Sequence, residues 1–366
     1  MKFPFRTYLM YLIPALVVVF GFAQIDTAIT QSPDSEIHLA VADQIAGNQA
    51  DEISGLPAGY GFLTGLITKT GLTSTQDAAL ILNLILLCIA QFFVWQIFFW
   101  QARLVNLLFL SPPVIAVFSG FSGDALFMAS TLGFTAGIIR FYDSGKISWL
   151  IVCAVASMFA FWSSFHGFIL LVLLFMISGG YYYIGKRRRA FYTMTVSLTG
   201  VILFSFVLWI NQVITGVSSL GLLQVPELSL LPGFLVQYAA GVLGELNPFL
   251  TVISNSAILF IVTFFASFAF LAWFAERFEP DLIRSPFRLN IIISKMTALL
   301  SLTGLLFLPL IETFDGYHFR HFTTAAFLFV GSVLTIFTYR VSISGFRVFQ
   351  IILLCWLGLA IAYHLV

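Results

Sequence analysis

Long apolar runs, separated by short polar segments, make up most of this sequence. Many of them are long enough to cross the roughly 30 Å hydrocarbon layer of a membrane as an α-helix. The chain of 366 residues is 60% hydrophobic and only 9% charged, whereas a soluble domain carries about 25% charged residues. The runs are continuously apolar rather than alternating, which does not fit a transmembrane β-barrel. The sequence therefore predicts an all-α polytopic membrane protein.

About eleven membrane-spanning helices are predicted from these runs, and the basic residues give their orientation. With a cytoplasmic N-terminus, all of the 17 Lys and Arg residues except Lys69 and Arg320 lie on the cytoplasmic side. Cytoplasmic loops carry an excess of basic residues, so this distribution supports both the orientation and the count. We interpret residues 1–366 as a single integral membrane domain. The predicted spans are 7–24, 77–100, 104–120, 124–141, 147–163, 166–184, 191–211, 252–274, 290–310, 322–339 and 347–365.

Two predicted outer loops are long, at residues 25–76 and 212–251, and we expect a site in the first of them. In that loop Ser32 is predicted to cap a helix that Gly47 ends, and the helix is amphipathic enough to lie on the membrane surface. A second short helix is expected after it. A capping sequence at Ser74 then marks the start of the next span.

Asp34 and Glu36 in this first loop are the first candidates for catalysis. A carboxylate at the lipid–water boundary is placed to take a proton from an acceptor hydroxyl, so Asp34 is predicted as a general base. His38 shares a helix face with Asp34 and is a candidate substrate-binding residue. An acid in the first turn of a helix is also stabilised by the helix dipole alone, and the spacing does not choose between the two roles.

Asp124 and His166 are two further candidates in short outer turns. Asp124 is predicted as a second carboxylate that faces the same pocket as Asp34 and positions either a divalent cation, such as Mg²⁺ or Mn²⁺, or a phosphate group of the substrate. No other cofactor is expected. A stabilising acid at the start of a helix is the alternative for Asp124. His166 is either a hydrogen-bonded interfacial histidine or a group for proton transfer or phosphate contact.

The two outer cations, Arg320 and Lys69, are candidates for binding an anion. A guanidinium group binds phosphate through two parallel hydrogen bonds, so Arg320 is the strongest of them, and His318 and His321 of the same loop are candidate substrate-binding residues. Arg320 also fits a salt bridge to an acid of its own loop. Lys69 also fits a side chain that extends to the membrane interface.

Four short motifs lie at the outer ends of predicted spans. They are Asp34-Ser35-Glu36 after the first span, Pro57-Ala58-Gly59-Tyr60 before the second, Asp124 after the third, and Arg320-His321-Phe322 at the start of a late span. This pattern resembles the GT-C superfamily of membrane glycosyltransferases, which use polyprenyl-phosphate-linked sugars. The resemblance implies that Asp34 is the catalytic base, Asp124 the second acid and Arg320 the phosphate-binding cation. His321 departs from the family, where Tyr is frequent. The stretch Ser164-Phe165-His166-Gly167 is also similar to polysaccharide polymerases of the bacterial envelope.

We therefore expect transfer of a sugar, with inversion, from a polyprenyl-phosphate-linked donor to a saccharide, lipid or protein acceptor at the outer membrane face. The protein is expected in a bacterial inner membrane with its site on the periplasmic side and with no nucleic-acid partner. An envelope polysaccharide polymerase is one alternative. A transporter that moves a lipid or amphiphile without chemistry is a second, and a non-catalytic membrane subunit of an assembly is a third.

Overall fold

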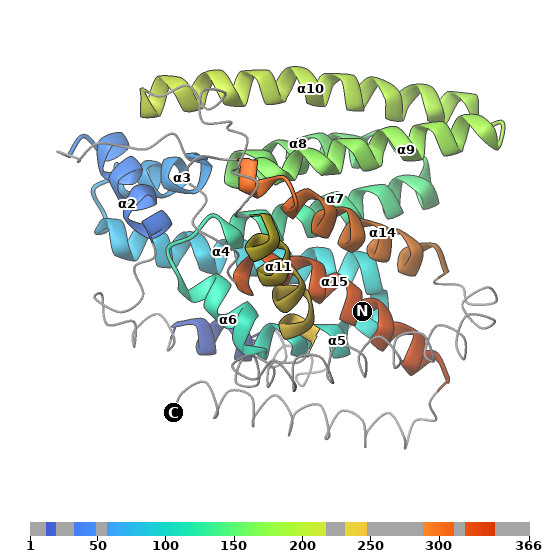
Figure 1. Cartoon of the computed structure of the whole chain (residues 1–366), viewed down its shortest axis with the longest axis horizontal. Helices are drawn as coiled ribbons and strands as arrows, with labels where there is room; N and C mark the ends of the chain where they lie inside the picture. The colour runs from blue at the N-terminus through green and yellow to red at the C-terminus, as the bar shows by residue number, and fades with distance from the viewer. Residues whose placement is uncertain are drawn as a thin grey trace.

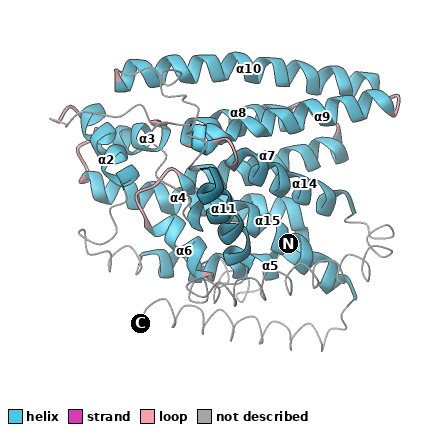
Figure 2. Ribbon diagram, in the orientation of Figure 1, coloured by secondary structure: helices cyan, strands magenta, loops and turns pink. Residues whose placement is uncertain are grey.

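The computed structural model describes residues 12–19, 33–48, 57–216, 231–246, 288–310 and 319–340. Every regular element in these ranges is helical, and Figure 2 shows no strand among them, so the predicted all-helical class is confirmed. Residues 12–19 are helical as well. The other elements are α2 Pro33–Ala46, α3 Gly59–Thr68, α4 Thr75–Phe98, η1 Phe99–Gln101, α5 Ala102–Val105, η2 Asn106–Leu110, α6 Pro112–Ser119, α7 Asp124–Ser144, α8 Ser148–Ser163, η3 Phe165–Phe168, α9 Ile169–Tyr183, α10 Arg187–Thr215, α11 Leu231–Leu246, α14 Arg288–Leu305, η4 Leu308–Leu310 and α15 Phe319–Arg340.

Four segments of the described ranges are long and apolar enough to cross a membrane. They are α4, α7, the segment Phe165–Tyr183 that joins η3 to α9, and α10. The predicted span at 104–120 is not one straight helix, because Ala102–Leu110 and Pro113–Ser119 meet at 72°. Two consecutive prolines, Pro112 and Pro113, remove two backbone N–H groups and restrict the residue before them, which accounts for the break.

The remaining predicted spans are covered in part. α8, with 16 residues, is a shorter apolar helix at the predicted span 147–163. α14 and α15 occupy the predicted spans 290–310 and 322–339. The predicted spans 252–274 and 347–365 lie outside the described residues, as do both ends of the span 7–24. The count of eleven therefore stays a prediction.

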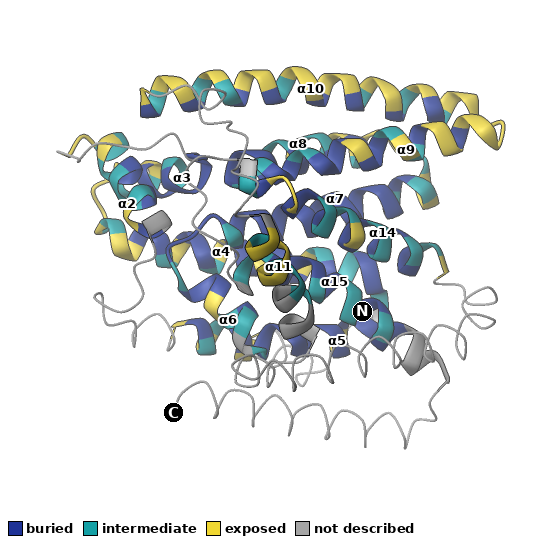
Figure 3. Cartoon of the chain, viewed as in Figure 1, coloured by how far each residue is buried: buried dark blue, intermediate teal, exposed yellow. Residues whose placement is uncertain are grey.

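The helices pack side by side with α7 in the middle (Figure 1). In the apolar 18-residue stretch of α7, 89% of the residues are buried, whereas in that of α10 only 22% are. Figure 3 shows the difference, with α7 mostly dark blue and the outer side of α10 yellow. The apolar residues of α10 that remain exposed are typical of a surface that faces lipid, because the hydrocarbon interior is as apolar as they are.

Two short helices, α2 and α3, lie together at one end of the bundle, which we call the α2 end (Figure 1). They lie backbone to backbone because α3 carries glycines where they meet. A Cβ atom at Gly61 would lie 2.6 Å from the carbonyl oxygen of His38, and one at Gly65 would lie 2.6 Å from that of Ala42. The predicted end of α2 is confirmed, since Gly47 has a φ of 90°.

The α2 end is also where several helices begin or end. The predicted cap of α4 is confirmed, because the Ser74 hydroxyl accepts a hydrogen bond from the Asp77 N–H at 3.1 Å. The end of α10 is attached here through the Asn211 side chain, which accepts a hydrogen bond from the Ala58 N–H at 2.7 Å. The basic start of α10 lies at the opposite end, where Arg189 donates to the Tyr142 carbonyl at 2.7 Å.

Candidate functional site

An ion pair between α7 and α15 is the centre of the candidate site. The Nε atom of Arg320 lies 3.3 Å from the Oδ2 atom of Asp124, and each side chain is 15% exposed. Asp124 is the first residue of α7 and Arg320 the second residue of α15, so two helix starts bring these charges together. The pair is accessible enough for a ligand to reach it and buried enough for its charges to be weakly screened.

The turn before α7 fixes where Asp124 lies. The Ser122 hydroxyl donates to Oδ2 of Asp124 at 3.1 Å. Gly123 packs directly against the end of α8, because a Cβ atom there would lie 2.7 Å from the carbonyl oxygen of Ser163. Any larger residue at Gly123 would move α7 or α8 and with it the carboxylate.

His166 lies next to the ion pair and is buried. Its Nδ1 atom is 2.6 Å from the Ser164 hydroxyl, and its ring lies on Phe127 with 4.3 Å between centroids. The imidazole interacts electrostatically with both Asp124 and His321. Among the described residues, its Nε2 atom has no hydrogen-bond partner. A buried nitrogen of this kind is costly unless a ligand or water satisfies it, so His166 belongs to the candidate site.

His38 connects α2 to the turn before α7 that carries Gly123 and Asp124. Its Nε2 atom accepts a hydrogen bond from the Gly123 N–H at 3.2 Å, and the side chain is buried. The His38 ring also meets Tyr60 edge-on at 5.4 Å between centroids. This contact holds α2 against the start of α7, which gives His38 a positioning role beside its predicted role in binding.

Tyr60 and Asn83 extend this connection, and sequence reasoning did not place them in the site. The Tyr60 hydroxyl donates to Asn83 at 3.0 Å, and the Asn83 amide donates to the Gly120 carbonyl at 2.9 Å. Burial raises the pKa of the Tyr60 phenol, so it remains a neutral donor. Asn83 is a polar residue within an apolar run, and that signal in the sequence could have identified it.

The other predicted site residues lie as follows. Asp34 is in the first turn of α2, one turn before His38, and its side chain lies outside the described residues, as does His318. Glu36 is exposed on α2. Lys69 is exposed at the end of α3, where its N–H caps the helix. The structure thus brings Asp124, His166, Arg320 and His321 together, with His38 behind Gly123, while Glu36 and Lys69 face outward.

A divalent cation at Asp124 remains a prediction. Within the described ranges no three His, Cys, Asp or Glu side chains gather as a metal site. The Asp124 carboxylate pairs with the Arg320 guanidinium instead, and a second positive charge there would be repelled by it. These residues fit an anion beside Arg320 better than a metal ion beside Asp124.

Comparisons with known proteins identify the fold. No protein-family model matches the sequence, and no curated protein matches it. Among solved structures, ArnT from Cupriavidus metallidurans in the apo state matches over 94% of this chain, with a TM-score of 0.51 and 13% sequence identity. The chain shares the fold of the GT-C glycosyltransferases.

A second solved structure agrees with this assignment. The archaeal oligosaccharyltransferase AglB from Archaeoglobus fulgidus, in complex with an inhibitory peptide and a dolichol-phosphate, matches over 90% of the chain with a TM-score of 0.51 and 12% identity. ArnT and AglB are both GT-C glycosyltransferases that use lipid-linked sugars. The chain spans 62% of the length of ArnT and 50% of that of AglB. The predicted resemblance to GT-C proteins is confirmed at the level of the fold.

Proposed function

We propose that this protein is a membrane glycosyltransferase that moves a sugar from a polyprenyl-phosphate-linked donor to an acceptor at the α2 end. One observation carries the proposal: the Asp124–Arg320 pair is partly buried beside His166 and is joined to α2 through the His38–Gly123 hydrogen bond, on a fold shared with GT-C glycosyltransferases. The α2 end then faces the outer, periplasmic side of the membrane, opposite the basic start of α10.

In this mechanism Arg320 binds the phosphate of the donor. A guanidinium has five N–H donors, more than one carboxylate accepts, and it binds phosphate with two parallel hydrogen bonds. Asp124 orients Arg320 through its Nε edge. Asp124 does not contact the phosphate itself, because a carboxylate and a phosphate in direct contact repel each other. Lys69 is exposed at the end of α3 and adds positive charge for the approaching donor.

Asp34 serves as the general base. The acceptor hydroxyl gives its proton to the Asp34 carboxylate while its oxygen attacks the anomeric carbon. The bond from that carbon to the phosphate oxygen breaks, and the polyprenyl phosphate leaves with the electron pair. A single displacement of this kind inverts the anomeric configuration. Since the phosphate is already an activated leaving group, the protein needs mainly positioning and electrostatic stabilisation.

The direct test measures release of polyprenyl phosphate when the purified protein is given a polyprenyl-phosphate sugar together with saccharide, lipid or peptide acceptors. Asp34→Asn is expected to abolish release without lowering thermal stability. Asp77→Asn is the matched control, because Asp77 is an exposed acid in the first turn of α4, and it should retain activity. Glu36→Gln tests whether the second acid of the Asp34-Ser35-Glu36 motif also takes part in catalysis. Full activity in Asp34→Asn removes this residue from the mechanism. Movement of intact donor lipid without release would instead identify a transporter.

A further inference from the structure

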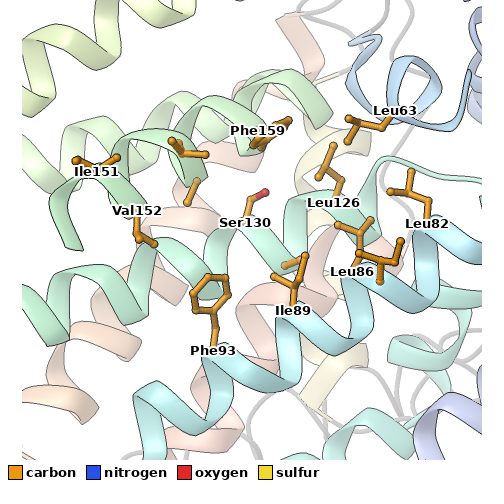
Figure 4. Close-up of a pocket in the computed structure, with 14 residues that line it drawn as sticks. Leu63, Leu82, Leu86, Ile89, Phe93, Leu126, Ser130, Ile151, Val152 and Phe159 are labelled. Carbon is orange, nitrogen blue, oxygen red and sulfur yellow. The ribbon is translucent and has the colours of Figure 1, made fainter. Parts of the chain in front are cut away.

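A groove lies between α4, α7 and α8, and Leu63 of α3 lines one end of it (Figure 4). Its volume is about 480 Å³, within the roughly 300–1,000 Å³ range of small-molecule sites. Fourteen residues line it, and Ser130 is the only one of them with a polar side chain. A water molecule needs two or more polar partners, so this groove suits a hydrocarbon chain and not water.

The walls of the groove are exposed on the outside of the bundle. Ile85 on α4 is 47% exposed, and on α8 Ile151 is 59% and Val155 is 44% exposed. The floor residues of α7, by contrast, are buried. Because α4 and α7 are both long and apolar enough to cross a membrane, the occupant reaches the groove sideways from the bilayer. A concave, apolar wall between two spans fits one extended lipid chain.

The groove lies on the side of α7 that is opposite to the ion pair. Leu126, Ala129 and Ser130 line it, and with 3.6 residues per turn the centre of their arc lies roughly 170° around the helix from Asp124. A donor whose phosphate contacts Arg320 approaches the other side of α7. The groove is therefore available for a second lipid while the donor is bound.

The end of the groove at Leu63 leads toward the helix that carries the predicted base. Leu63 belongs to α3, which lies against α2 through the close approach of Gly61 to the His38 carbonyl. A lipid whose head group lies at this end of the groove would therefore present it beside α3 and α2. Asp34 lies in the first turn of α2.

We propose that this groove binds a hydrocarbon chain of a lipid-anchored acceptor, whose hydroxyl is delivered to the α2 end while the donor lies on the opposite side of α7. The assignment rests on the proposed glycosyl transfer and narrows its acceptor to a lipid.

Photolabelling tests the groove without any turnover. Two probes are added separately to the protein in liposomes: a phospholipid with a diazirine in one acyl chain, and a polyprenyl phosphate with a diazirine in its isoprenoid chain. The phospholipid probe is expected to label peptides of α4 and α8, and Val155→Trp should lower that labelling about tenfold by filling the groove. Val201→Trp is the matched control, since Val201 is 47% exposed on α10 and lies outside the groove.

Two labelling results would overturn the assignment. One is labelling of α4 and α8 by the polyprenyl phosphate, lost in Val155→Trp, because the donor would then occupy the groove. The other is equal labelling of both Trp variants and the wild type by the phospholipid, because the contact would then be ordinary bilayer lipid.

A transfer assay tests the acceptor class and separates the two proposals. A donor with a radiolabelled sugar is incubated with the protein and a total lipid extract of host membranes. The label should appear in a new organic-soluble product, and Val155→Trp should lower its yield while Val201→Trp does not. Label that appears only on water-soluble products with added peptide or saccharide overturns the lipid acceptor and leaves the glycosyltransferase. If no sugar is transferred to any acceptor, the proposed glycosyl transfer and the lipid acceptor are both wrong. Labelling of the groove would then still identify a lipid-binding site.

Discussion

Asp124 and Arg320 are 196 positions apart in the sequence, yet Oδ2 of the first lies 3.3 Å from Nε of the second. Asp124 is the first residue of α7 and Arg320 the second residue of α15; the helix dipole favours the acid at its helix start, and the carboxylate offsets the unfavourable position of the guanidinium. An ion pair at 15% exposure lies between the surface case, worth about 0–1 kcal/mol, and the buried case, where loss of one partner costs about 3–5 kcal/mol.

Removal of the guanidinium tests its role in phosphate binding. Arg320→Gln is expected to lower kcat/KM for the donor roughly 10- to 100-fold, because hydrogen bonds to charged groups are worth about 1.5–3 kcal/mol. Most of the loss should appear as a raised KM for the donor. The measurement is initial-rate kinetics over a range of donor concentrations. Arg188→Gln, at the exposed start of α10, is the control. Unchanged donor KM in Arg320→Gln contradicts the phosphate contact.

His166 offers a test that separates function from stability. His166→Phe keeps an aromatic ring against Phe127 and removes a buried nitrogen that has no hydrogen-bond partner among the described residues. Thermal stability should change by less than about 1 kcal/mol, since the packing is preserved, whereas sugar transfer should fall. Ser164→Ala, which removes only the partner of Nδ1, should have a smaller effect on transfer. Wild-type transfer by His166→Phe would reduce His166 to a packing residue.

Local features were predictable from the sequence because they depend on neighbouring residues. The cap at Ser74 and the helix end at Gly47 follow from hydrogen bonds and backbone angles within a few positions. The broken segment near Pro112 was predicted as one span because hydrophobicity alone does not register a bend of 72°.

Long-range pairings were beyond reach of the sequence. The distribution of basic residues placed Arg320 and Asp124 on the same side of the membrane, but an acid of the same loop was the predicted partner of Arg320. The contact of His38 with Gly123 joins residues 85 positions apart, and it depends on how α2 packs against the bundle. Periodicity along one helix predicts which face is apolar and not which neighbour covers it.

The rate of sugar transfer with and without divalent cations tests whether the protein depends on a metal ion. Because the Asp124 carboxylate pairs with a guanidinium, transfer is expected to continue after chelation with EDTA and dialysis. The assay should use donor and acceptor prepared without divalent cations, with added Mg²⁺ or Mn²⁺ as the comparison. A loss of activity that either cation restores would establish the metal that the sequence predicts.

The packing of α3 on α2 provides a test of how the loop that carries Asp34 is held. Gly65→Ala places a Cβ atom 2.6 Å from the Ala42 carbonyl oxygen and 2.7 Å from the Cβ of Ile45, and such overpacking costs about 1–3 kcal/mol. Gly179→Ala on α9 is the matched control, since its new Cβ has no atom within 4 Å. It should be neutral or stabilise the helix by up to about 1 kcal/mol. Thermal unfolding in detergent measures both, and transfer assays should show a loss for Gly65→Ala alone. Equal melting temperatures and activities for the two variants would mean that α3 does not hold α2 in place.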